Sequence, residues 1–470
     1  MLFIVMHNKE GRMLRKKEDL FFLSVMIVTF MIGFDTTGLG VAIPDIAVRL
    51  GFGIKEGTWL SVSYTAGFAA FLLPAGIITD KTGYRLTLLS SLSVFVLSSV
   101  YSTYCETLTE FTTIRLIQGI SAAFLNTSAM ALLNVLYPIG GPRDRAGAFK
   151  KWSMFLGLSF ALGPILGSLI VSYLSWGWIM LINIPLSLVV LFPFVGSTAM
   201  ETFKKGALGQ VSLTSTLPAT IILLFITMNP YFNQTFSGLG RHLFYAIIIA
   251  CLIVLGSLHL FSSKSFTRLP ELKNVNFLIS LLLPIFFSIS YWSLFVTLPG
   301  YITVKFNYSP MMVMTSMLCL SIPLTLIPVF TLQDKLKLNA MSGFVFIALG
   351  LLALAYLFNT NVKHQGLLLD ITLFIMGCGA AILNPIMARV VMDNVAPENS
   401  GLAAAITSTL RQMGFAVGVA FYSLMTDSNI SNGLNISESH AFIASSILPL
   451  IALSICIYLN KRSQLLSKAH

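Results

Sequence analysis

Long apolar stretches recur along this chain from one end to the other, and they leave it few ways to fold. Each is about twenty residues long, the length that an α-helix needs to cross the hydrocarbon core of a bilayer. They are too long and too continuously apolar for the strands of a membrane barrel, which alternate over about ten residues. We therefore expect an all-α polytopic membrane protein. The fourteen expected spans are 21–44, 57–78, 86–104, 111–136, 148–173, 177–195, 213–228, 242–261, 277–302, 311–330, 341–357, 367–392, 402–424 and 441–459.

The composition agrees with a lipid environment. Of the 470 residues, 56% are hydrophobic and only 10% are charged, whereas soluble domains carry roughly a quarter charged residues. The formal net charge of +11 would suggest nucleic acid in a soluble protein, but here the basic residues lie in loops, where they set topology. The five cysteines and six histidines form no ligand pattern. We expect no nucleic-acid partner, no metal and no cofactor.

The basic residues also orient the spans. With the N-terminus inside, the inner side holds 22 of the 29 Lys and Arg residues and the outer loops hold five. Such an excess on one side is the positive-inside pattern of cytoplasmic loops. The sequence therefore predicts a multi-pass protein of the cell (inner) membrane with both termini cytoplasmic. Residues 1–20 form a cytoplasmic leader, in which Met13 is an alternative start, and 461–470 form a cytoplasmic tail.

Two halves of the chain resemble each other. The inner loop at Thr79–Lys81 is similar to residues 333–335. The segment that begins with the glycine at position 119 is similar to the one that begins at 377, and the Gly-x-x-x-Gly pair that begins at 163 is matched by a pair that begins at 414. The offsets, from 251 to 258 residues, join helices of the same orientation, which indicates parallel repeats. We expect two six-helix bundles, 21–196 and 276–460, and two inserted helices in 211–262. Solute would bind near the midplane between the bundles, with access alternating as they rock.

Four of the charged residues within the expected spans are candidates for a functional role. A charged carboxylate inside a bilayer is costly, so Asp35 is a candidate for taking up and releasing a proton as its exposure changes. Helix rise places Asp35 and Arg115 at similar depth in the outer half of the membrane. Asp370 and Arg411 are the corresponding candidates in the second half. The alternatives are structural contacts for Asp35 and Arg115, a water-facing carboxylate for Asp370, and a structural partner for Arg411.

Several motifs resemble the major facilitator superfamily and, within it, the fourteen-helix drug:proton antiporters. FDTTGLGVAIP from Phe34 to Pro44 is similar to the L-D-x-T-x-x-N-V-A-L-P signature, with Gly40 where Asn is usual. GIITDKTGYR from Gly76 to Arg85 is similar to G-x-x-x-D-R-x-G-R-R, and RLIQG from Arg115 is similar to R-x-x-Q-G. The helix-5 segment from Ser159 to Ser168 resembles the antiporter motif G-x-x-x-G-P-x-x-G-G. WGWIMLINIPL and RQMG, which begin at positions 176 and 411, also resemble this branch.

The resemblance implies roles for these residues. The spans expected at 21–44 and 111–136 would line a central cavity together, so that Arg115 tunes the proton affinity of Asp35 or of a substrate-bound state. The charged turn after the second span would form an inner latch that breaks as the bundles rock, although its charges also set topology. Its residues are Gly76, Asp80, Lys81, Gly83 and Arg85, with Asp334 and Lys335 in the second half. Gly163, Pro164 and Gly167 would make helix 5 a kinked, close-packed antiporter helix that limits leak. Ordinary close packing is the alternative.

The cavity would be lined by aromatic and amide side chains. The aromatic ones suit stacking on planar or cationic solutes, although such residues more often form interfacial belts. The candidates for this lining are Trp59, Tyr64, Gln118, Asn126, Trp292 and Asn384.

The leading functional hypothesis is proton-coupled efflux of amphipathic, including cationic, drugs or similar small molecules. Two alternatives stay open, the export of one metabolite such as a siderophore, lipid or peptide-like product, and a non-transporting membrane receptor or scaffold. The residues present no nucleophile–base pattern and no P-loop, so we expect no enzyme and, unless a separate subunit supplies the P-loop, no ATP-driven pump. The expected partners are the solute, protons and membrane lipid. In a cell with two membranes, a periplasmic adaptor and an outer-membrane channel would complete the route.

Overall fold

The computed structural model describes residues 2–137, 145–195, 274–330, 336–360, 364–392, 400–425 and 438–468, together with short helical pieces between 216 and 257. The helices of the first half are α1 (Leu2–Thr37), α2 (Leu39–Leu50), α3 (Ile54–Thr82), α4 (Tyr84–Ser102), α5 (Leu108–Leu136), α6 (Arg145–Tyr173), α7 (Gly177–Leu181), α8 (Asn183–Leu191) and the 3-10 turn η1 (Phe192–Phe194). Those of the second half are α11 (Val275–Ser280), α12 (Leu282–Phe287), the π-helical turn η5 (Ser288–Trp292), α13 (Leu294–Phe306), α14 (Pro310–Phe330), α15 (Leu336–Asn359), α16 (Gln365–Met392), α17 (Ser400–Met425) and α18 (Glu438–Lys468).

The expected spans before residue 196 and after residue 276 each fall on one helix or on a run of consecutive helices. Ten helices of the described part are long and apolar enough to cross a membrane. The chain is therefore a multi-pass, all-helical membrane protein, and its described residues contain no strand. The spans expected at 213–228 and 242–261 fall mostly outside the described residues, so the total of fourteen stays a prediction.

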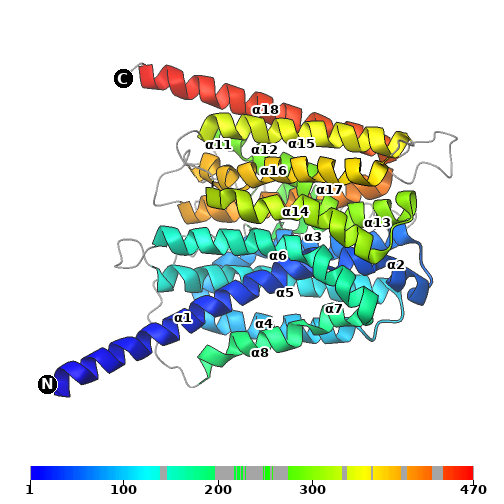
Figure 1. Ribbon diagram of the computed structural model, residues 1–470. Helices are drawn as coiled ribbons and strands as arrows, with labels where there is room; N and C mark the ends of the chain where they lie inside the picture. The colour runs from blue at the N-terminus through cyan, green and yellow to red at the C-terminus, as the bar shows by residue number, and fades with distance from the viewer. Residues whose placement is uncertain are drawn as a thin grey trace.

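The helices form two groups that lie side by side, with both chain ends at the same end of the molecule (Figure 1). We call this the termini end. The helices from α1 to α8 make up the first group, and those from α11 to α18 make up the second. The groups meet where α3 packs on α17, α6 on α14 and α2 on α13. The α2–α13 contact lies toward the end opposite the termini and closes the seam between the groups there.

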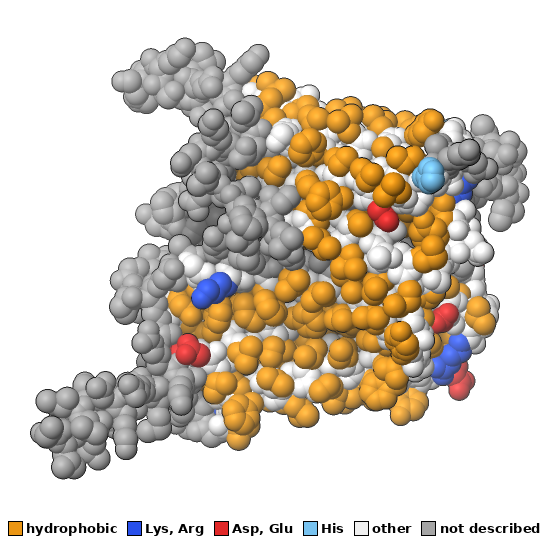
Figure 2. All heavy atoms as spheres, viewed as in Figure 1, with side chains coloured by type: hydrophobic (Ala, Val, Ile, Leu, Met, Phe, Trp, Pro, Cys, Tyr) orange, Lys and Arg blue, Asp and Glu red, His pale blue; other side chains and the backbone are white. Residues whose placement is uncertain are grey.

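The surface matches a lipid environment. Figure 2 shows a broad hydrophobic band across the helices, with charged side chains mostly near the two ends. Large apolar side chains such as Leu97 and Leu188 are more than half exposed. An apolar surface of this extent would be a liability in water, so it follows that lipid covers it.

Glycines at matching positions of the two halves set the close helix contacts. A Cβ on Gly119 of α5 would strike the backbone of Tyr64 in α3, and one on Gly377 of α16 would lie 2.5 Å from the carbonyl oxygen of Leu320 in α14. Small residues let membrane helices approach this closely. The repeat seen in the sequence therefore corresponds to equivalent helix contacts in both halves.

The second pair of repeated glycines packs against irregular backbone. A Cβ on Gly167 of α6 would lie 2.6 Å from the carbonyl oxygen of Gly38, where the first span breaks between α1 and α2. A Cβ on Gly418 of α17 would lie 2.9 Å from Cα of Ile289 in the π-helical turn. The sequence predicted neither the break nor the turn. Both interrupt spans that carry polar residues, and π-helical turns often occur at functional sites.

Candidate functional site

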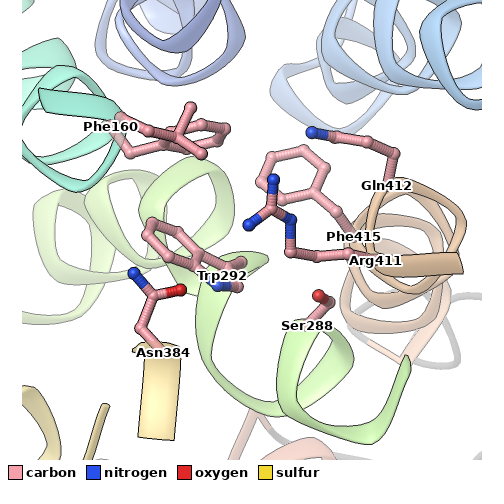
Figure 3. Close-up of a pocket in the computed structure, with 8 residues that line it drawn as sticks. Phe160, Ser288, Trp292, Asn384, Arg411, Gln412 and Phe415 are labelled. Carbon is pink, nitrogen blue, oxygen red and sulfur yellow. The ribbon is translucent and has the colours of Figure 1, made fainter. Parts of the chain in front are cut away.

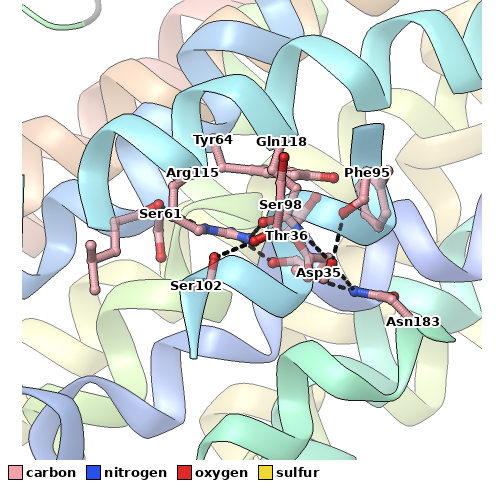
Figure 4. A network of polar contacts seen from close by, with 12 residues as sticks. Asp35, Thr36, Ser61, Tyr64, Phe95, Ser98, Ser102, Arg115, Gln118 and Asn183 are labelled. Carbon is pink, nitrogen blue, oxygen red and sulfur yellow. Dashed lines mark hydrogen bonds and ion pairs between the residues drawn. The ribbon is translucent and has the colours of Figure 1, made fainter. Parts of the chain in front are cut away.

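An ion pair lies inside the first helix group. Asp35 lies two residues before the end of α1, and Arg115, in the third turn of α5, extends to meet it. Nη1 of Arg115 donates to Oδ2 of Asp35, and both side chains are completely buried. The sequence placed these residues at similar depth, and the structure joins them (Figure 4).

The guanidinium of Arg115 is surrounded by hydrogen-bond acceptors and one aromatic ring. Nη2 donates to the carbonyl oxygen of Asp35 at 3.0 Å, Nε to that of Leu60 at 3.2 Å, and Nη1 also to Oε1 of Gln118 at 2.7 Å. The ring of Tyr64 lies beneath it, with 4.4 Å between the guanidinium carbon and the ring centroid. A buried charge is tolerated when it is paired and hydrogen-bonded in this way. Arg115 is therefore held in one position.

Asn183 and Ser99 complete the network around Asp35. Nδ2 of Asn183 donates to Oδ1 of Asp35 at 3.3 Å and to Oγ of Ser99 at 3.1 Å. Nε2 of Gln118 donates to the same Oγ at 2.8 Å. The motif that contains Asn183 resembles the antiporter branch, but it predicted no role for Asn183 itself. An amide side chain inside an apolar span is the sequence signal that could have identified this residue. Side chains of α5 and α8 thus contact the carboxylate that α1 carries, and Ser99 of α4 joins them to one another.

A small cavity lies between the two helix groups (Figure 3). Its wall comes from α6, η5, α16 and α17, and the lining residues are Leu156, Phe160, Ser288, Trp292, Asn384, Arg411, Gln412 and Phe415. In this conformation it has room for about one water molecule. The π-helical turn carries both Ser288 and Trp292 to the wall. The sequence predicted Trp292, Asn384 and Arg411 as cavity or charged candidates, and the structure brings them together.

Aromatic rings close this cavity. Phe160 of the first group meets Trp292 of the second edge to face, with ring centroids 4.8 Å apart, and Phe415 lies 6.5 Å from Phe160. Edge-to-face rings at such distances attract each other. The cavity is therefore closed by a contact between the groups, which must separate to admit a solute.

Other predicted residues lie elsewhere. Tyr64 and Gln118, expected in the cavity, surround Arg115 because α3 packs so closely on α5 at Gly119. Trp59 is buried in an apolar core cluster, and Asn126 is half-buried on α5 away from the cavity wall. Asp370, near the start of α16, accepts a hydrogen bond from Oγ of Ser316 at 2.7 Å. No ion pair joins Asp370 to Arg411, and the structure describes both residues.

The expected inner latch lies at the termini end. Gly83 separates α3 from α4 with φ +93°, a conformation that favours glycine. Arg85 donates from Nη2 to the carbonyl oxygen of Phe194 at 3.4 Å and so ties this turn to η1. Gly76, Asp80 and Lys81 lie on the last turns of α3, where they are buried, half-buried and exposed. Asp334 and Lys335 lie outside the described residues.

The expected antiporter helix is α6. Gly163 and Gly167 are buried against the break at Gly38, and Pro164 is buried inside the helix between them. A Cβ on Gly163 would lie 2.9 Å from the amide nitrogen of Gly38. The same face of α6 carries Phe160 to the cavity. One helix thus touches the segment beside Asp35 and the wall between the groups.

Comparison with known proteins agrees with this arrangement. The sequence profile described as Major Facilitator Superfamily matches residues 25–419. The chain is 24% identical to the "Riboflavin transporter RibZ" of Clostridioides difficile, over 94% of this chain and 96% of that protein. It is 26% identical to the "Multidrug resistance protein Stp" of Mycobacterium tuberculosis, over 83% and 72% of the two chains. It is 22% identical to the "Multidrug transporter protein MdtP" of Bacillus subtilis, over 90% and 78%.

Proposed function

Because the chain belongs to the Major Facilitator Superfamily, we propose that it is a secondary active transporter that exports small organic molecules in exchange for protons. The observation that carries this proposal is the fully buried Asp35, held by Arg115 and Asn183 inside a membrane helix group. The multidrug relatives support the export of amphipathic compounds. The charged candidates in the second half lack such a network, so we place the proton site in the first half.

The ion pair supplies a means of coupling. When Asp35 is charged, it balances Arg115, and the pair is stable in the dry interior. A proton on Asp35 removes that balance and leaves a buried cation, which is costly. The helices that hold the pair, α1, α5 and α8, would then favour an arrangement in which Arg115 meets water. Proton uptake would in this way shift the equilibrium between the two access states.

The sidedness and the branch are part of the proposal. We place the termini end in the cytoplasm of a cell-membrane protein, because most basic residues fall in the expected loops of that side. The fourteen-helix antiporter branch follows from the motifs at Asp35, Arg115 and Gly163. The turn at Gly83 would act as the inner latch. A periplasmic adaptor and an outer-membrane channel remain proposed partners for a cell with two membranes.

The test is transport in sealed vesicles that contain only this protein. A panel of cationic, neutral and anionic fluorescent dyes is added, and a pH gradient is imposed. We expect dye to accumulate in the compartment of lower pH and to leave when a protonophore collapses the gradient. Movement that ignores the gradient for every transported dye would contradict proton coupling.

A second candidate function is the transport of a single metabolite. It is favoured by the similarity to the riboflavin transporter, which extends over nearly the whole of both chains. Competition separates the candidates. A multidrug carrier should transport several unrelated dyes that compete with one another, whereas a metabolite carrier should transport none of them but should take up riboflavin or a compound of comparable shape.

A further inference from the structure

Arg411 is a cation set in the wall of the cavity between the helix groups (Figure 3). Its guanidinium extends from α17 into the middle of the lining, between Trp292 and Phe415. Within the described part of the chain it has neither a hydrogen-bond nor an ion-pair partner. Arg411 is half-buried, whereas Arg115 is completely buried and is held by four acceptor groups. The contrast indicates that the partner of Arg411 is a bound ligand that is not part of the chain.

Three more polar atoms of the same wall have no hydrogen-bond partner among the residues that the structure describes. They are Oγ of Ser288, Nε1 of Trp292 and Oε1 of Gln412, on side chains that are at most 4% exposed. A buried polar atom without a hydrogen bond has lost its contact with water and gained nothing in return, and most buried polar groups of native proteins do have a partner. Several such atoms around one cavity point to a ligand that completes their hydrogen bonds.

The position of Arg411 in the repeat supports a role at the seam. It lies three residues before Gly414, as Phe160 lies three residues before Gly163. Positions 160 and 411 both line the cavity, one from each half of the chain. One half offers an aromatic ring there and the other offers a guanidinium. A bound molecule would contact both.

The lining defines the chemistry of that molecule. Phe160, Trp292 and Phe415 offer ring faces and edges, which suit a planar aromatic body. Arg411 and Trp292 offer N–H donors, and the cation favours negative charge. The cavity wall contains no carboxylate among the described residues that could balance a cationic solute.

We infer that the transported solute is a planar aromatic molecule with an anionic, acceptor-rich edge, and that Arg411 binds this edge. The inference rests on the proposed function and narrows its substrate class. The cavity as described holds only about one water molecule, so binding requires Phe160 and Trp292 to part. That separation is the same movement that alternating access demands.

The test compares two dyes that share a three-ring xanthene body. Fluorescein carries negative charge, and rhodamine 123 carries positive charge. Their binding to the purified full-length protein in lipid nanodiscs is measured by fluorescence anisotropy, without any gradient. We expect fluorescein to bind more tightly than rhodamine 123. Arg411→Gln should weaken fluorescein at least about tenfold, the loss of one charge-assisted hydrogen bond, and should leave rhodamine 123 as tight or tighter. Arg411→Lys should retain much of the fluorescein affinity.

The matched control is Arg49→Gln, an exposed arginine on α2, which should change neither affinity. If Arg411→Gln does not fold, Asn384→Asp places a carboxylate on the same wall and should weaken fluorescein while strengthening rhodamine 123. The inference would be overturned if neither substitution changed the affinity for fluorescein. It would also be overturned if the wild-type protein bound no fluorescein or bound rhodamine 123 more tightly. Binding is read without a gradient, so Arg411-dependent binding without proton-driven transport would refute the proposed function and leave this inference standing.

Discussion

At the scale of the residue, two arginines inside the helix groups have opposite surroundings. Arg115 is paired with Asp35 and hydrogen-bonded to backbone and amide oxygens. Arg411 lines a cavity with no partner among the described residues. The buried pair of Arg115 can respond to a proton on Asp35, whereas the half-buried Arg411 is placed to bind a charged ligand. From this difference we propose that the proton binds in the first half of the chain and that the solute binds in the cavity between the two helix groups.

The pair should behave as a unit in stability. Arg115→Gln leaves Asp35 buried without its cation, and breaking a buried pair in this way costs about 3–5 kcal/mol. The double variant with Asp35→Asn removes both charges and should be more stable than Arg115→Gln alone. Thermal unfolding in detergent measures both. A double variant that loses the sum of the single losses would show that the two side chains contribute independently.

At the scale of the element, glycines decide how closely the helices approach. Gly163 and Gly167 hold α6 against the break at Gly38, and Gly414 and Gly418 hold α17 against α12 and η5. The glycines thus let each helix approach an irregular segment of a neighbouring helix closely. Both irregular segments lie at residues that the proposed mechanism uses: Asp35 is three residues before the break, and Ser288 and Trp292 are in the π-helical turn.

One added methyl group tests this packing. Gly163→Ala would place its Cβ 2.9 Å from the amide nitrogen of Gly38, and overpacking of this kind costs about 1–3 kcal/mol. Gly300→Ala in α13 meets nothing within 4 Å and should be neutral or gain up to about 1 kcal/mol of helix propensity. The measurement is the thermal unfolding midpoint of each variant. Equal midpoints would mean that α6 can move away freely and that its close packing is unimportant.

The helices were predictable from the sequence, and much of the network was not. Apolar length alone locates the spans, because a bilayer allows little but helices. The similar depth of Asp35 and Arg115 follows from helix rise, so their meeting could be anticipated. The roles of Asn183 and Ser288 depend on which helix faces touch, and the sequence gives little sign of this. For the same reason Tyr64 was expected in the cavity but lies under Arg115.

At the scale of the whole molecule, the two helix groups are closed on each other at the end opposite the termini. A Cβ on Gly40 of α2 would lie 3.1 Å from Cα of Val296 in α13, and these residues belong to different groups. The rings of Phe160 and Trp292 close the seam further in. The structure is thus shut toward the side that we propose to be outside, and transport requires this contact to open.

Labelling of a cysteine can follow that opening. The Val296 side chain is 2% exposed in the closed state. A cysteine introduced there by Val296→Cys should therefore react with a membrane-impermeant maleimide only when the two helix groups separate. Val48→Cys, 87% exposed on α2, should react at all times from outside intact cells, which also tests the sidedness. Burial raises the pKa of the native Cys105 thiol, which lies at this end, to about 11. Little thiolate forms there near neutral pH, so its background reaction should be slow.

The expected result is slow labelling of Val296→Cys at rest and faster labelling when a pH gradient and a transported dye are supplied. Equal rates in both conditions would contradict alternating access at this seam. Reaction of Val48→Cys only after the cells are broken open would reverse the proposed orientation.

The most direct test of the account is to separate exchange from accumulation in Asp35→Asn. In vesicles with equal pH on both sides, this variant should still exchange labelled for unlabelled dye, because solute binding lies at the seam and not at position 35. Under a pH gradient it should fail to concentrate dye, whereas the wild type does so. Gradient-driven accumulation by Asp35→Asn at the wild-type level would show that the proton is carried elsewhere and would contradict the central claim.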